Sequence, residues 1–81
     1  MTQYDVEQFI LGAESLVKEN KKVLNFMQDL LPNLKLRYEE SKLLIDKKLY
    51  EQQVDNIKFM ECHIQKLEGY IETYKKTLKN W

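Results

Sequence analysis

The second half of the chain carries an apolar residue at every seventh position, and this spacing constrains the fold more than any other feature. The series is Leu36, Leu43, Tyr50, Ile57, Ile64, Ile71 and Leu78. A second series follows it at an offset of three residues and comprises Met60, Leu67, Tyr74 and Trp81. Two such series line one side of an α-helix, and the seam that they form has to be covered. The spacing therefore predicts one long helix over about residues 34–79.

An amphipathic helix is also expected over about residues 2–30. Thr2 followed by Asp5 is the pattern of a capping box, which begins a helix. The seam of this helix has gaps of four and three residues and comprises Val6, Ile10, Ala13, Val17, Asn20, Leu24, Met27 and Leu31. A second line beside it comprises Phe9, Leu16, Val23 and Leu30. The combined stripe is wider than a two-stranded contact needs and indicates more than one neighbour.

Pro32 is the strongest candidate for the connection between the two helices. Proline lacks a backbone donor and disfavours helical geometry at the residue before it. Asn33, which follows, is a residue type that turns and helix caps favour. The sequence therefore predicts an all-α fold, an antiparallel helical hairpin with its turn at residues 31–33. The alternative is that Pro32 only kinks one near-continuous helix.

A reversal at residues 31–33 would leave the end of the second helix without cover from the first. We expect this projecting seam to bind a second copy or another protein, because exposed aromatic side chains often anchor interfaces. The predicted partner-binding residues are Ile57, Met60, Ile64, Leu67, Tyr70, Ile71, Tyr74, Leu78 and Trp81. Assembly would then give a coiled-coil or helical-bundle oligomer. The alternative is a break near Gly69, which would fold the chain into a three-helix bundle.

The residues most suited to chemistry do not form the pattern of a catalytic or ligand site. Cys62 and His63 are the only residues of their kind, and neighbours on a helix point about 100° apart, so they do not make a nucleophile–base pair. Carboxylate metal sites in bundles use Glu-x-x-His, whereas Glu61 stands only two residues from His63. We therefore expect no enzyme activity, no metal, no cofactor and no small-molecule substrate.

The composition limits the remaining classes of function. The 81 residues suffice for one domain over 1–81, and a core of that size is marginal without a partner. The 13 basic and 13 acidic residues are interspersed, which does not suit a nucleic-acid-binding surface. No apolar run approaches the roughly 20 residues of a membrane helix. A single unpaired cysteine is typical of a reducing compartment, so we expect a cytoplasmic protein.

These features predict a non-catalytic protein–protein interaction module, such as a small helical chaperone, adaptor or assembly factor, that binds through an apolar and aromatic helix face. Two alternatives remain open. One is a small regulator or inhibitor of the phage or immunity type that blocks a target protein. The other is a structural coiled-coil subunit of a larger complex. The sequence leaves open whether the partner is a second copy or a different protein.

Overall fold

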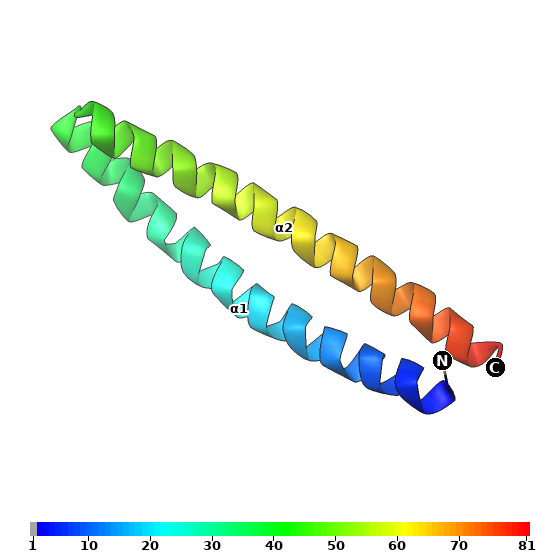
Figure 1. The fold of residues 1–81 in the computed structure, drawn as a ribbon. Helices are drawn as coiled ribbons and strands as arrows, with labels where there is room; N and C mark the ends of the chain where they lie inside the picture. The colour runs from blue at the N-terminus through cyan, green and yellow to red at the C-terminus, as the bar shows by residue number, and fades with distance from the viewer. Residues whose placement is uncertain (1) are drawn as a thin grey trace.

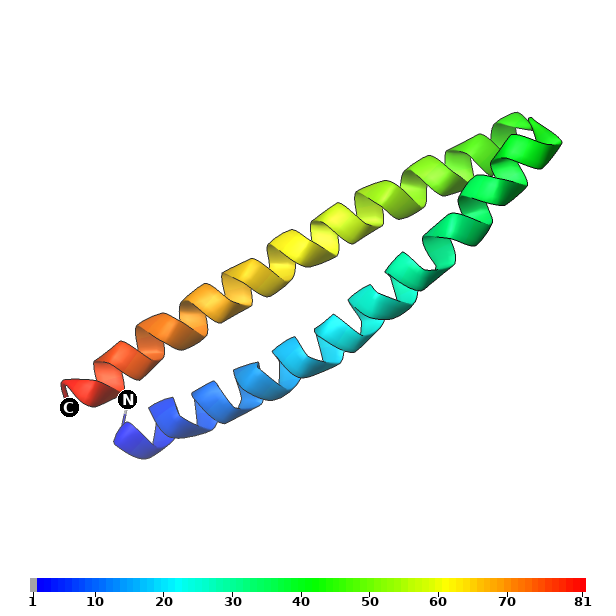
Figure 2. The same ribbon diagram turned by 180° about the vertical axis from the view of Figure 1, so that it is seen from behind.

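The computed structural model describes residues 2–81 as a hairpin of two long antiparallel helices (Figures 1 and 2). Helix α1 spans Gln3–Ser41 and helix α2 spans Leu44–Lys79. The molecule measures 59 × 15 × 15 Å, and the two termini lie at the same end. The predicted all-α hairpin is confirmed.

The turn lies at Lys42 and Leu43, so the prediction of a turn at residues 31–33 is wrong. Pro32 stands inside α1, and Figure 1 shows this helix curving along the stretch that contains it. The reason is that the seam continues across the proline: Leu31, Leu34 and Tyr38 are all half-buried against α2. Pro32 itself is exposed, so the backbone hydrogen bond that it cannot donate is lost on the solvent side, where the free carbonyl is accessible to water.

Three local interactions build the turn. Lys42 adopts the left-handed conformation (φ 55°), and its N–H donates to the carbonyl of Tyr38 at 2.9 Å, which closes α1. The Ser41 hydroxyl accepts a hydrogen bond from the Leu43 N–H (3.2 Å) and donates to the carboxylate of Asp46. Asp46 lies in the first turn of α2, where the helix dipole favours a negative charge.

The two helices are nearly equal in length, so neither projects beyond the other. Because α1 continues past Pro32, its first turns lie beside the last turns of α2 (Figure 2). The chain also stays helical through Gly69, whose carbonyl accepts a hydrogen bond from the Thr73 hydroxyl at 3.0 Å. The predicted projecting seam and the alternative break near Gly69 are therefore both wrong.

Each helix contributes one seam with alternating gaps of four and three residues. The buried and half-buried seam positions of α1 are Val6, Ile10, Ala13, Val17, Asn20, Leu24, Met27, Leu31, Leu34 and Tyr38. Those of α2 are Asp46, Tyr50, Gln53, Ile57, Met60, Ile64, Leu67, Ile71, Tyr74 and Leu78. Burial is greatest near the termini, where Val6, Ile10, Ile64 and Ile71 form the centre of the core. Among the described residues of α1, none beyond Val17 is fully buried.

Candidate protein-interaction surface

Seven of the nine predicted partner-binding residues face α1. Ile57, Ile64 and Ile71 are buried, and the half-buried members are Met60, Leu67, Tyr74 and Leu78. The four half-buried residues pack against the core cluster near the termini. Only Tyr70 and Trp81 point largely outward, with 57% and 56% of their surface exposed. The seam that the sequence assigned to a partner is thus covered within the hairpin.

One side of the hairpin is closed by charged and polar pairs between the helices. The pairs are Glu14–Lys75 (3.1 Å), Lys21–Glu68 (3.0 Å) and Gln28–Glu61 (3.4 Å). They repeat every seven residues along both helices, and each α1 member follows a seam residue by four positions. We call this side the charged flank. Its ion pairs are half-exposed and contribute little stability each, but they define how the two helices are aligned.

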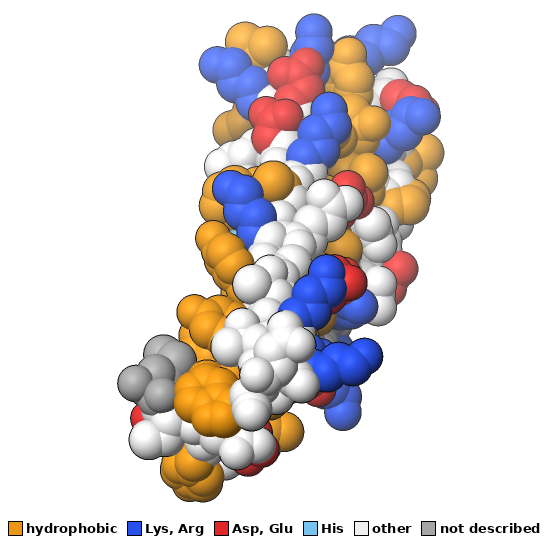
Figure 3. All heavy atoms as spheres, turned by 90° about the vertical axis from the view of Figure 1, so that its right-hand side faces the viewer, with side chains coloured by type: hydrophobic (Ala, Val, Ile, Leu, Met, Phe, Trp, Pro, Cys, Tyr) orange, Lys and Arg blue, Asp and Glu red, His pale blue; other side chains and the backbone are white. Residues whose placement is uncertain are grey.

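The opposite side of the hairpin is apolar and open, and we call it the apolar flank. Nine of the fifteen large apolar side chains that are exposed lie there: Phe9, Leu16, Val23, Phe26 and Leu30 on α1, and Ile45, Leu49, Phe59 and Tyr70 on α2. Four of the α1 members directly precede a seam residue in the sequence. Consecutive residues of an α-helix are turned by about 100°, which places these four on the side away from the charged flank. Figure 3 looks at the hairpin from the end where the termini lie and shows hydrophobic side chains among the charged ones on its surface.

Contacts at the terminal end show how the apolar flank meets the core. The rings of Phe9 and Tyr74 lie 4.5 Å apart between centroids, at an angle of 49°. A shallow groove beside them is lined by Gln8, Phe9, Gly12, Ala13, Leu16 and Leu67. A Cβ added to Gly12 would meet no atom within 4 Å, so packing inside the hairpin does not require glycine there. On α2, the rings of Phe59 and His63 stack 6.4 Å apart.

Only four charged side chains occupy the positions of the apolar flank between residues 9 and 77. They are Glu19, Arg37 and Glu40 on α1 and Lys66 on α2. Arg37 is already engaged, because its Nε lies 3.4 Å from Oδ1 of Asp46. Glu19 has only a loose contact with Lys22 at 3.9 Å on its own helix. The flank is therefore nearly uncharged along most of the hairpin.

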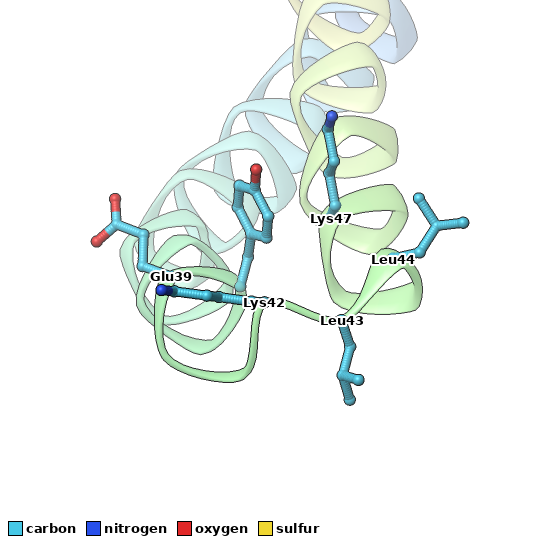
Figure 4. A pocket seen from close by; sticks show the side chains of 6 residues that line it. Glu39, Lys42, Leu43, Leu44 and Lys47 are labelled. Carbon is cyan, nitrogen blue, oxygen red and sulfur yellow. The ribbon is translucent and has the colours of Figure 1, made fainter.

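A second hollow lies at the turn and is lined by Tyr38, Glu39, Lys42, Leu43, Leu44 and Lys47. Figure 4 shows Leu43 and Leu44 pointing outward at the tip, with Lys42 on one side of the turn and Lys47 on the other. This hollow is open and holds no cluster of polar groups directed at one point. Among residues 2–81, no three His, Cys, Asp or Glu side chains are placed to hold a metal ion.

A titratable group with a perturbed pKa lies at the start of α1. The backbone N–H of Thr2 donates to the carboxylate of Asp5 (3.1 Å), and the Asp5 N–H donates to the Thr2 hydroxyl (3.1 Å). The backbone N–H of Thr2 and, to a smaller extent, its hydroxyl lower the pKa of the Asp5 carboxyl below its ordinary value. This is the predicted capping box, and it serves the helix.

Comparison with protein-family models, with curated proteins and with solved structures found no match. Within the described part of the chain, neither helix contains a segment long and apolar enough to cross a membrane.

The α1 half of the apolar flank was visible in the sequence as the line through Phe9, Leu16, Val23 and Leu30. Its α2 half was not apparent as a line, because Ile45 and Phe59, like Leu49 and Tyr70, are two or three heptads apart with polar residues at the positions between them. The structure brings the two halves to one side of the hairpin, and this joint surface replaces the seam as the candidate site.

Proposed function

We propose that this protein is a non-catalytic protein–protein interaction module, a small helical adaptor, chaperone or assembly factor, that binds its partner through the apolar flank. The observation that carries the proposal is the asymmetry of the hairpin's two sides. One side is closed by repeated charged pairs, whereas the other exposes nine large apolar side chains and few charges. Proteins that remain monomeric rarely expose a contiguous apolar patch of more than a few hundred Å².

The contact between α1 and α2 supports this reading. Its seams, with alternating gaps of four and three residues, are those of an antiparallel two-stranded coiled coil. A pair of helices in isolation needs only that seam, so the extra line of apolar residues on α1, of which Phe9 contacts Tyr74, exceeds what the hairpin itself requires. Further helices laid against the apolar flank would extend the pair into a bundle.

The proposal places binding on α1 and the adjoining edge of α2, and it assigns no catalytic group, cofactor, nucleic acid or membrane. Tyr70 is the one predicted partner-binding residue that belongs to this flank. A cytoplasmic location suits the exposed, unpaired thiol of Cys62.

A photo-crosslinking experiment tests the proposal. Benzoylphenylalanine replaces Phe26 on the apolar flank or Leu11 on the opposite side of α1, two positions with 64% and 60% exposure. Irradiation is carried out on the purified protein and in the cells that produce it. We expect protein adducts from position 26 and few from position 11. Equal adduct yields from both positions, or none from position 26 in either setting, would contradict the proposal.

A further inference from the structure

We propose that the apolar flank is covered by a second copy of this chain, which packs flank to flank with both turns at the same end. The product is a four-helix dimer in which α1 of each copy lies over α2 of the other. This inference rests on the proposed function and adds the identity and the orientation of the partner.

The hairpin exposes more surface than a compact chain of the same mass. The hairpin exposes 6389 Å², whereas a compact monomer of 9.8 kDa exposes about 5,200 Å². The excess is about 1,200 Å² per chain. A dimer that buried this area from both copies would cover about 2,400 Å² in total, which lies in the range of obligate homodimers. One second copy is therefore enough to bring the chain to an ordinary exposed surface.

The alignment of the two helices determines which residues lie at the same height along the hairpin. Where a residue of α1 faces a residue of α2, their residue numbers add up to about 86. The sum is 83 for the contact of Phe9 with Tyr74 and 89 for the ion pair of Glu14 with Lys75. Glu19 and Lys66 satisfy the same relation, so they lie at the same height along the hairpin. Both stand on the apolar flank, on different helices, and each is exposed.

A twofold rotation about an axis parallel to the hairpin keeps heights unchanged and places α1 over α2 of the second copy. Glu19 of one copy then lies over Lys66 of the other, and the symmetry makes this pair twice. The flank's two most exposed aromatic side chains, Phe26 and Phe59, match in the same way. The remaining positions at this spacing pair Gly12 with Thr73, Asn33 with Gln52 and Glu40 with Ile45. Four of the five pairs are compatible, and the fifth, Glu40 over Ile45, lies beside the turns.

The opposite arrangement, with the turns at opposite ends, lacks this match. It places α1 over α1, and the α1 part of the flank offers Glu19, Glu40 and Arg37 as charges, of which only Arg37 is a cation. Arg37 is held by Asp46 at 3.4 Å, so no free cation of that helix is left for Glu19. Electrostatic complementarity selects orientation in interfaces of this kind, and here it selects the arrangement with both turns together.

Charge reversal tests the orientation. The dissociation constant of the purified dimer is measured by sedimentation equilibrium for Glu19→Lys, Lys66→Glu and the double variant. We expect each single reversal to weaken the dimer about tenfold and the double reversal to restore it. Glu72→Lys reverses an exposed charge outside the apolar flank and serves as the matched control, with no effect expected. Circular dichroism checks that each variant keeps its helices.

A distance measurement gives an independent readout. A spin label at Leu43→Cys, with Cys62→Ser to remove the native thiol, reports the separation of the two turns in the dimer. Turns at the same end predict a separation below about 30 Å, since packed helix axes lie about 8–10 Å apart. Turns at opposite ends predict a separation close to the 59 Å length of the hairpin.

The possible failures are distinguishable. A dimer with distant turns, or one that the double reversal does not restore, overturns the orientation. A chain that stays monomeric while position 26 crosslinks to a different protein overturns the second copy and leaves the proposed function standing. A monomer without adducts at position 26 overturns both.

Discussion

Nε of Arg37 on α1 lies 3.4 Å from Oδ1 of Asp46 on α2, so an ion pair bridges the two helices beside the turn. Asp46 is the one buried charged residue among those that the structure describes, with 5% of its surface exposed. It also accepts the hydrogen bond from the Ser41 hydroxyl. Its carboxylate therefore links the end of α1 to the start of α2, where no glycine assists the reversal.

Replacing Asp46 by alanine should destabilise the hairpin by about 1–3 kcal/mol. The variant leaves the Ser41 hydroxyl and the Arg37 guanidinium without their acceptor and removes a negative charge from the first turn of α2. Urea unfolding followed by circular dichroism measures the change. Asp55→Ala, at an exposed site of the same helix, is the control and should change stability by less than about 0.5 kcal/mol. Equal losses in the two variants would contradict the role assigned to Asp46.

Replacing Pro32 by alanine should stabilise the protein by about 1–3 kcal/mol. The position is exposed inside α1, so alanine restores an N–H and removes a residue that costs about 3 kcal/mol in a helix interior. The same unfolding experiment applies, with Asn25→Ala, on the same face of α1, as a control that should gain about 0.5 kcal/mol or less. A loss of stability in Pro32→Ala would instead favour a turn at residues 31–33.

Gly69→Ala should raise the free energy of unfolding by about 0.5–1 kcal/mol. Glycine is a poor helix former, and an added Cβ at this position meets nothing within 4 Å. The gain follows from a continuous α2. A substitution that left stability unchanged or lowered it would mean that the chain needs the conformational freedom of glycine there, as a break would require.

The capping box predicts a dependence of stability on pH near the ordinary pKa of aspartate. The pKa of Asp5 is lowered from 3.8 in the folded chain, first by the Thr2 N–H and then by the Thr2 hydroxyl. The contribution of Asp5 is therefore fully present above pH 3.8 and is lost as the pH falls through the lower folded pKa. A carboxyl NMR titration measures it directly. A midpoint for Asp5 at or above 3.8, or one that Thr2→Ala leaves unchanged, would refute the assignment.

Sequence reasoning succeeded where the signal was periodic. Both helices, the capping box at Thr2 and most seam positions follow from spacing and residue type alone. The location of the turn did not, because Lys42 adopts a left-handed conformation that is not typical of lysine. The prediction gave the helix-breaking effect of Pro32 more weight than the apolar seam. The seam keeps its alternating gaps of four and three residues through Leu31, Leu34 and Tyr38. That continuity was present in the sequence and outweighs one missing hydrogen bond.

The candidate surface was only half accessible to the same reasoning. The line through Phe9, Leu16, Val23 and Leu30 indicated a second neighbour for the first helix. Which side of the second helix adjoins that line depends on how the two helices are rotated about their axes. The pairs Glu14–Lys75 and Lys21–Glu68 settle that rotation, and they required the structure.

The most direct test of the interaction surface is the mass of the purified chain after charge is placed on the apolar flank. Leu16→Glu combined with Val23→Glu adds two carboxylates to the flank, and Leu11→Glu combined with Tyr4→Glu adds two to the other side of α1. Light scattering coupled to size exclusion should give a dimer for the wild type and for the Leu11/Tyr4 variant. The Leu16/Val23 variant should be a monomer that keeps its helices. A Leu16/Val23 variant with the same mass as the wild type would contradict the account.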